Sequence, residues 1–139
     1  MKTILITGAT SGIGLAAAKK LANSKNNLIL CGRRQYKLDE ISNELSKITN
    51  VLSLSFDVSD KKEVNKVLEN ISEEFSAIDI LINNAGNAHG LDTIQDGSLD
   101  DWDKMIDSNV KGLLYVSRVI MPKMIEQKSG HIINIGSLA

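Results

Sequence analysis

Three glycines in the stretch TGATSGIG, at residues 7–14, have the spacing G-x-x-x-G-x-G and directly follow a short apolar run. Gly8 permits a tight turn after that run, and Gly12 lets the backbone approach a pyrophosphate because no Cβ stands in the way. Gly14 allows the following helix to pack closely on the preceding strand. The N–H groups that begin such a helix attract phosphate oxygens, and nearby hydroxyls can add hydrogen bonds. The stretch therefore predicts a dinucleotide phosphate site that comprises Gly8, Thr10, Ser11, Gly12, Ile13 and Gly14.

Two adjacent arginines, Arg33 and Arg34, follow the second apolar run. A site for NAD usually presents Asp or Glu to the ribose 2′-hydroxyl about 20 residues beyond the glycine turn. Here the first acid is Asp39, well into the next amphipathic segment. Guanidinium groups suit a 2′-phosphate, both by charge and by forked hydrogen bonds. We therefore expect NADP rather than NAD, the alternative being that the two arginines are merely solvated on a loop.

Short apolar runs that alternate with longer amphipathic segments must position these residues. The runs are rich in Ile, Leu and Val, as expected of strands covered on both faces, and lie at residues 3–7, 28–30, 51–56, 79–83 and 131–135. Helical patterns lie between them at residues 14–23, 37–47, 60–75 and 100–127. Asp60 and Glu63 form a capping-box pattern at the start of the third helix, and Pro122 is expected to kink the fourth. This alternation predicts an α/β fold, a doubly wound parallel sheet with helices on both faces. We expect it to be of the Rossmann type, with strand order 3-2-1-4-5.

Composition and charge narrow the class of protein. The 139 residues are 42% hydrophobic and 24% charged, which suits one globular domain. A net charge of −1 offers no basic field for nucleic acid and no polybasic face for a membrane, and no apolar stretch approaches the roughly 20 residues of a membrane span. The single cysteine, Cys31, fits a reducing compartment, so we expect a cytoplasmic protein. We expect no metal site, since Asp100, Asp101 and Asp103 are best explained as the acidic start of a helix.

Five landmarks together resemble the classical short-chain dehydrogenase/reductase family. They are TGATSGIG at 7–14, Asp57-Val58 after the third predicted strand, NNAG at 83–86, Asn109 within SNVKG, and HIINIGS at 131–137. They occur in the family's order and spacing along the whole chain. The stretches GRRQYKLDE and DWDKMIDSNVKGL are similar to those of the NADP-dependent 3-hydroxy acid dehydrogenases, also called serine 3-dehydrogenases.

The resemblance implies further cofactor contacts. Asp57 would hydrogen-bond the adenine amino group and the backbone of Val58 would contact the ring, the alternative for Asp57 being a cap at the strand end. Asn84, Ala85 and Gly86 would belong to the turn that lines the cofactor ribose, although two asparagines and a glycine also suit a plain turn.

The resemblance also implies catalytic roles. Asn109 would bind a water in a proton relay, the alternative being a purely structural hydrogen bond. Ser137 would hydrogen-bond the substrate carbonyl or hydroxyl. The family further uses a Tyr-x-x-x-Lys pair beyond this serine, whereas Tyr36 and Tyr115 precede it and neither is followed by lysine at the fourth position. We therefore expect residues 1–139 to form one dinucleotide-binding domain, the N-terminal part of a longer enzyme cut after its fifth strand and inactive alone.

The implied parent reaction is reversible hydride transfer between NADP(H) and a secondary alcohol or ketone, with a 3-hydroxy acid such as serine or 3-hydroxypropionate as the expected substrate. A non-catalytic dinucleotide sensor or scaffold is the alternative, as is a flavodoxin-like module. Asn109 and Ser137 argue against a sensor. The broad apolar surface of the helix at 100–127 predicts a homo-oligomer, which the resemblance implies to be a tetramer. His89 could touch a substrate carboxylate, or it could be a solvated loop residue.

Overall fold

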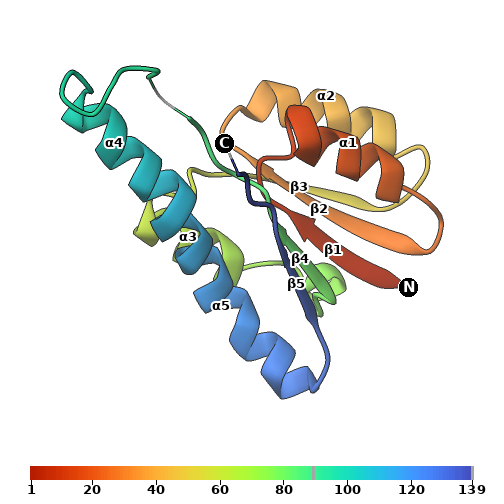
Figure 1. The fold of residues 1–139 in the computed structure, drawn as a ribbon. Helices are drawn as coiled ribbons and strands as arrows, with labels where there is room; N and C mark the ends of the chain where they lie inside the picture. Colours follow the sequence, from red (N-terminus) through yellow and green to blue (C-terminus); the bar gives the residue numbers. More distant parts are fainter. Residues whose placement is uncertain (89, 139) are drawn as a thin grey trace.

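Five parallel strands form one sheet in the computed structural model, which describes residues 1–88 and 90–138 (Figure 1). The strands are β1 (Lys2–Ile6), β2 (Asn26–Gly32), β3 (Val51–Ser55), β4 (Ile80–Asn83) and β5 (His131–Asn134). Their order is β3-β2-β1-β4-β5, and each neighbouring pair is parallel. The predicted doubly wound sheet order is therefore confirmed.

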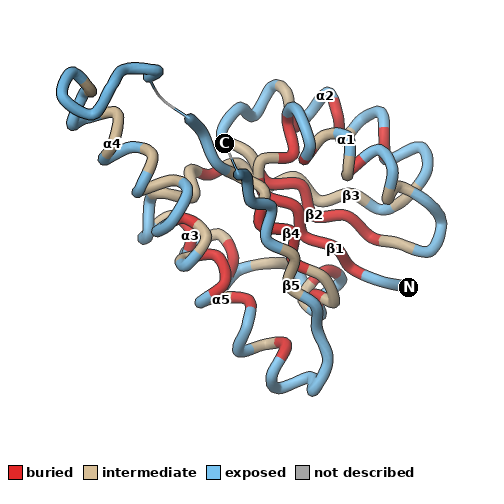
Figure 2. Tube along the Cα trace, viewed as in Figure 1, coloured by how far each residue is buried: buried red, intermediate tan, exposed pale blue. Residues whose placement is uncertain are grey.

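Helices cover both faces of this sheet. The helices α1 (Gly12–Leu21) and α2 (Gln35–Leu45) pack on one face, and α3 (Lys61–Glu69) and α5 (Gly112–Gln127) pack on the other. Neighbouring side chains of β1 point to opposite faces, so Leu5 lies in the cluster under α3 and α5 while Ile4 and Ile6 lie in the cluster under α1 and α2. Figure 2 shows this buried core running through the central strands, with α4 (Leu99–Ile106) left largely exposed.

The third helix is shorter than the sequence pattern predicts. Asp60 caps α3 as expected, since its Oδ1 accepts a hydrogen bond from the Glu63 N–H at 3.1 Å. The helix ends at Glu69 rather than near residue 75, because the Asn70 side chain turns back to the Lys66 carbonyl at 2.6 Å. A short 3₁₀ turn, η1 (Glu73–Phe75), follows and buries Phe75 in the same core. In the sequence, the apolar side chain of Phe75 continued the helical pattern, and the predicted helix was therefore too long.

The predicted single helix over 100–127 is also interrupted. It is divided into α4, a π-helical segment η2 (Asp107–Lys111), and α5. Pro122 lies inside α5, which continues to Gln127, so the change of hydrogen-bond register occurs near Asn109 and not at the proline. In the described part of the chain no helix combines the length and apolar character needed to cross a membrane.

The end of α5 carries a backbone strain that a substitution can relieve. Lys128 has φ +55°, the left-handed conformation, and its N–H donates to the Ile125 carbonyl at 3.0 Å. Because a Cβ is unfavourable in this conformation, we expect Lys128→Gly to raise the free energy of unfolding by about 0.5–1 kcal/mol. Urea unfolding of Lys128→Gly and Lys128→Ala checks this. The alanine variant keeps the Cβ, so an equal gain from both would contradict the explanation.

Candidate functional site

A cleft of about 900 Å³ lies at the carboxyl ends of the strands. The chain leaves β1 toward one face of the sheet and β4 toward the other, and ligands of doubly wound sheets bind at such a point. The cleft collects almost all of the predicted site residues, namely Gly8, Thr10, Ser11, Gly12, Ile13, Arg33, Arg34, Asp57, Val58, Asn84, Ala85, Gly86, Asn109 and Ser137. His89 lies outside the described residues.

Gly12 and Gly14 have different structural roles in the glycine turn. Gly12 has φ +54°, and a Cβ built on it would meet nothing within 4 Å, so the backbone here faces open space. Gly14 is buried behind the turn and is not among the residues that line the cleft. A Cβ on Gly14 would lie 2.2 Å from the Gly8 carbonyl oxygen and 2.4 Å from Asn84 Nδ2. Gly14 therefore allows close packing, while Gly12 leaves room for a ligand.

The start of α1 is left open for an anion. Ser11 is the residue that precedes the helix, and its side chain makes no capping hydrogen bond. No acidic residue stands in the first turn of α1, whereas Asp60 caps α3. The first N–H groups of α1 therefore keep both their hydrogen-bonding capacity and the positive end of the helix dipole.

Thr7 and Asn84 clasp the ends of β1 and β4 together. The Thr7 hydroxyl accepts hydrogen bonds from the N–H groups of Asn84 and Ala85, both at 3.0 Å. In return, Asn84 Nδ2 donates to the carbonyls of Thr7 at 3.2 Å and Gly8 at 3.1 Å. Sequence reasoning missed Thr7 as a site residue. The available signal was a hydroxyl at the last position before the glycine turn.

The two arginines stand beside the glycine turn at the end of β2. Arg34 Nη2 donates to Thr10 Oγ1 at 3.1 Å, so one guanidinium is tied to the turn. Arg33 is exposed and lines the same cleft. Cys31 lies in the wall just before them, and burial raises the pKa of its thiol far above the usual range. The thiol is therefore neutral and contributes shape rather than charge.

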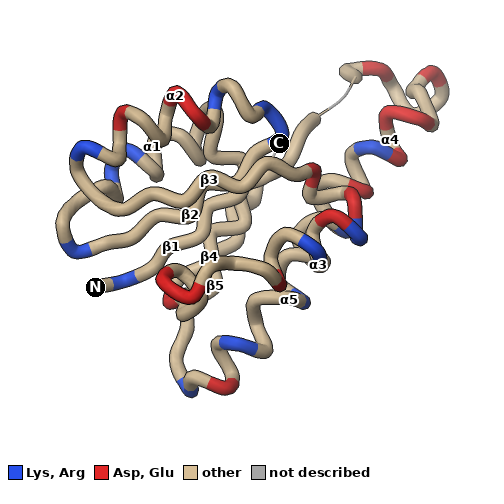
Figure 3. Tube along the Cα trace, turned by 180° about the vertical axis from the view of Figure 1, so that it is seen from behind, with Lys and Arg blue, Asp and Glu red and all other residues tan. Residues whose placement is uncertain are grey.

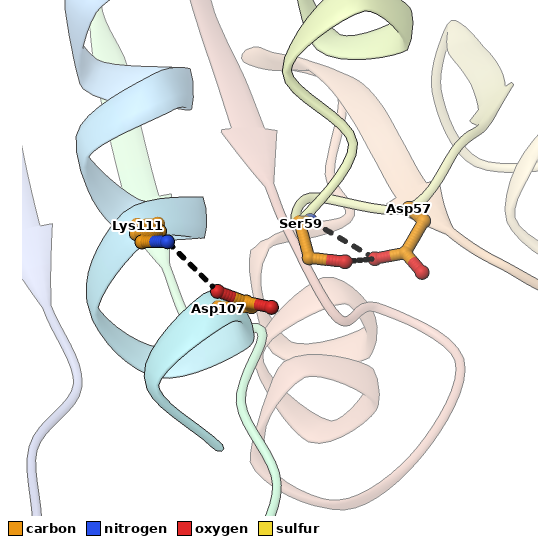
Figure 4. A network of polar contacts seen from close by, with 4 residues as sticks. All are labelled: Asp57, Ser59, Asp107 and Lys111. Atoms are coloured by element: carbon orange, nitrogen blue, oxygen red, sulfur yellow. Dashed lines mark hydrogen bonds and ion pairs between the residues drawn. The ribbon is translucent and has the colours of Figure 1, made fainter. Parts of the chain in front are cut away.

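Asp57 takes part in a local cap and also faces the cleft. Its Oδ1 accepts hydrogen bonds from Ser59 N–H at 2.9 Å and Ser59 Oγ at 2.8 Å (Figure 4). The strand-end cap considered from the sequence is therefore present, and Asp57 still lines the cleft. Val58 touches the start of α5, where a Cβ on Gly112 would lie 2.7 Å from Val58 Cγ2.

An ion pair stands on the helical side of this loop. Lys111 Nζ lies 3.1 Å from Asp107 Oδ1 within η2 (Figure 4). The hydrogen bond with Asp107, together with its negative charge, raises the pKa of Lys111. Both side chains are about half exposed, so the pair contributes little to stability.

Asn109 uses its side chain to hold the loop after β4. Its Oδ1 accepts from the Asn87 N–H and its Nδ2 donates to the Asn87 carbonyl, both at 2.8 Å. Gly86 makes this approach possible, because a Cβ there would lie 2.7 Å from Asn109 Oδ1. The amide therefore has the structural partners weighed as an alternative to a water. Its role in a proton relay stays a prediction.

Neither tyrosine reaches the cleft. Tyr36 is 67% exposed on α2, and Tyr115 packs against the core on α5. Asp100 and Asp101 stand in the first turn of α4, as predicted, where Ser98 accepts from the Asp101 N–H at 3.3 Å. The described residues contain no group of three or more His, Cys, Asp or Glu side chains placed to hold a metal ion.

A sequence profile described as short chain dehydrogenase matches residues 2–139. The chain belongs to the short chain dehydrogenase family. It is 40% identical over 136 residues to the NADP-dependent 3-hydroxy acid dehydrogenase of Escherichia coli K12, covering 98% of this chain and 54% of that protein. It is 44% identical over 137 residues to sulfoacetaldehyde reductase 2 of Chromohalobacter salexigens, with the same coverage. The chain thus spans about half the length of the curated relatives it matches.

Solved structures of the family share this fold. A closed serine dehydrogenase complexed with NADP⁺ gives a TM-score of 0.88 at 39% identity, and the match covers 98% of this chain and 54% of that one. An NAD⁺-bound xylitol dehydrogenase gives a TM-score of 0.94 at 30% identity, covering 99% of this chain and 54% of that one.

The residues that line the cleft have the shape and charge to hold a dinucleotide. The open backbone at Gly12 and the uncapped start of α1 suit a pyrophosphate. Beside them, Arg33 supplies positive charge and Asp57 keeps one oxygen that makes no hydrogen bond to Ser59. Buried deeper in the cleft wall, Asn83 Oδ1 has no hydrogen-bond partner among the described residues.

Replacement of Gly12 and of Gly14 by alanine should lower the free energy of unfolding by different amounts. Gly14→Ala places a Cβ against backbone that cannot move aside, so we expect a loss of about 3 kcal/mol or more in the free energy of unfolding. Gly12→Ala meets only the left-handed backbone penalty of about 1–2 kcal/mol. Urea unfolding of both variants measures the difference. A larger loss for Gly12→Ala would contradict the packing role of Gly14.

Proposed function

We propose that this chain binds NADP(H) in the cleft and forms the cofactor-binding half of an oxidoreductase that transfers a hydride to and from a small hydroxy acid. The observation that carries the proposal is the arginine pair beside the glycine turn. Arg34 is tied to Thr10 at 3.1 Å, and both arginines line the cleft. Asp39 accepts instead from Gln35 Nε2 at 2.8 Å on the exposed side of α2. A 2′-phosphate therefore finds positive charge where an NAD site offers an acid.

The cofactor would lie across the carboxyl ends of β1 and β4, where the chain leaves the sheet toward opposite faces. Gly8, Thr10, Ser11, Gly12 and Ile13 would surround the pyrophosphate. Asp57 and Val58 would meet the adenine, and Asn84, Ala85 and Gly86 would line the ribose nearest the reacting end. Gly14 would support the turn from behind. The names of several relatives, including the dehydrogenase of E. coli, state that they depend on NADP.

The hydride chemistry itself belongs to the bound nicotinamide. Ser137 would hydrogen-bond the substrate oxygen, and Asn109 would hold the loop after β4 in place and take part in the proton relay. The acid–base step requires a group that can exchange a proton with the substrate oxygen. Tyr36 and Tyr115 lie away from the cleft, so we assign that step to the part of the relatives' length that these 139 residues do not span.

A small organic acid is the proposed substrate class. The relatives act, by their names, on a 3-hydroxy acid and on sulfoacetaldehyde. Both compounds carry an acidic group close to the reacting oxygen. Serine and 3-hydroxypropionate are therefore the first substrates to test.

We also propose that the protein is a homo-oligomer, a tetramer by family likeness, in the cytoplasm. The outer face of α4, η2 and α5 supports the oligomer, since it exposes a stripe of large apolar side chains, namely Ile106, Val110, Leu114, Met121 and Ile125. Stripes of this kind mark protein–protein interfaces. The lone buried cysteine, Cys31, suits a reducing compartment.

Binding measurements test the cofactor assignment. Calorimetry with the natural full-length protein should show NADPH binding more tightly than NADH. Arg33→Ala should weaken NADPH binding by about tenfold or more, the cost of one charged hydrogen bond. Arg118→Ala, which removes an exposed arginine of α5 away from this cleft, is the matched control. NADH binding as tightly as NADPH would overturn the assignment.

Substrate assays test the reaction class. With NADP⁺, 3-hydroxypropionate and serine should be oxidised with a kcat/KM at least about tenfold above that of neutral alcohols of equal length, because only the acids can use a charged contact. No turnover of any hydroxy acid would remove the substrate proposal. NADPH binding without turnover of any alcohol would favour a sensor.

Light scattering tests the oligomer. Leu114→Asp should lower the measured mass, because it places a charge at the centre of the exposed stripe. Ile48→Asp is the control, since Ile48 is 53% exposed, close to the 57% of Leu114, but lies beyond α2. A monomeric wild-type protein would contradict the proposal.

A further inference from the structure

A small polar network interrupts the apolar contact between the sheet and α5. Asn83 Nδ2, at the end of β4, donates to Ser117 Oγ on α5 and to Asn134 Oδ1 on β5, both at 3.0 Å. Asn83 is 4% exposed and Ser117 is 9% exposed. Val116 and Ile120 on the same helix lie in the apolar core. The network therefore links β4, β5 and α5, and two of its members, Asn83 and Asn134, line the wall of the cleft.

Stability alone gives no reason for a serine at this place. The other buried residues of α5 are Gly112, Val116, Ile120 and Met124, and Ser117 is the one buried polar residue of that helix. A buried polar network contributes net stability only when all its members are satisfied, and Asn83 Oδ1 has no partner among the described residues. An alanine at 117 would fit the helix and avoid one buried hydroxyl. The hydroxyl is therefore better explained by what it holds in place.

The network holds the point where the chain leaves β5. Asn134 stands opposite Asn83 in the parallel register, and the Ile135 N–H donates to the Asn83 carbonyl at 3.0 Å. Beyond Ile135 the chain turns into the cleft, where Ser137 lies. Ser117 thus fixes the amide of Asn83, which in turn fixes the side chain of Asn134, close in sequence to Ser137.

We propose that Ser117 is a positioning residue, which acts through Asn83 and Asn134 to direct the segment 135–137 into the cleft. The inference rests on the proposed function, because it takes Ser137 as the group that contacts substrate. Among residues 1–88 and 90–138, the Asn83 side chain is anchored by Ser117 and Asn134, and its Oδ1 has no hydrogen-bond partner. Loss of the Ser117 hydroxyl leaves one anchor, so the amide can rotate to satisfy its oxygen and release Asn134.

Amide hydrogen exchange and kinetics on the natural full-length protein test this proposal together. In Ser117→Ala the Ile135 N–H should exchange about fivefold to tenfold faster, the factor for one lost hydrogen bond, while amides of β1 and β2 keep their rates. The kcat for hydroxy-acid oxidation should fall by a similar factor, and the affinity for NADPH should stay within twofold of wild type. Ser117→Thr, which keeps the hydroxyl, should restore both readouts.

Two further variants make the test specific. Ser53→Ala removes another buried hydroxyl, from the β3 edge of the sheet, that has no partner in the described part of the chain, and it should change neither readout. Asn134→Ala removes the second anchor at an exposed position, so it should fold and reproduce the Ser117→Ala effect.

The outcomes separate the two proposals. Ser117→Ala indistinguishable from Ser53→Ala in both readouts would overturn the inference, as would a uniform rise of exchange throughout the sheet, which indicates a purely structural role. A wild-type protein that binds no NADPH would instead defeat the proposed function. The exchange of Ile135 would still report whether Ser117 holds the end of β5.

Discussion

The clasp between Thr7 and Asn84 is the interaction on which the rest of the site depends. A parallel sheet that sends its chain to opposite faces after β1 and β4 separates the two loops where a ligand must bind, and the backbone ladder between these strands ends with the Thr7 N–H donating to the Ile82 carbonyl at 3.1 Å. The Thr7 hydroxyl and the Asn84 amide close that gap with four hydrogen bonds. Gly8 and Gly14 permit the approach, because a Cβ at either would collide with Asn84. The open backbone at Gly12 and the start of α1 are therefore presented from a rigid floor.

Further contacts join η2 and α5 to the loops that follow β3 and β4. The π-helical segment η2 meets both neighbouring loops, since Asn109 bonds the backbone of Asn87 and the adjoining Gly112 packs on Val58. Helix α5 is in turn anchored from behind, where Lys123 Nζ donates to the Leu68 carbonyl at the end of α3. Figure 3 shows the accompanying distribution of charge, with acidic residues along the loop before α4 and on α4, and the basic segment that precedes α2 beside the C-terminal end of the chain. Arg33 and Arg34 thus place positive charge at the cleft, which the carboxylate of Asp57 also lines.

The local sequence pattern was sufficient to predict the strands, the approximate positions of the helices and most of the residues of the site. Apolar runs of three to six residues predicted all five strands, because strands buried on both faces tolerate little else. Parallel strands bring their carboxyl ends to one edge, so residues such as Arg33, Asp57 and Ser137 could be assigned to one cleft from their positions after strands. The pattern failed where side chains redirect the backbone. Asn70 ended α3 early, and η2 replaced an α-helical turn that the composition of residues 107–111 does not distinguish from its neighbours.

The sequence by itself determined the fold class and the glycine turn, because these follow from periodicity and from a motif only a few residues long. The resemblance to the family added further residues around the cleft, among them Asp57, Asn109 and Ser137. Tertiary structure alone decided which partner each polar group takes. It joined Asn109 to Asn87, Arg34 to Thr10, and Ser117 to Asn83, pairs that lie 22, 24 and 34 residues apart in the chain. Such pairings depend on distances of a few ångströms between elements that the chain brings together only on folding, and no local rule of sequence encodes them.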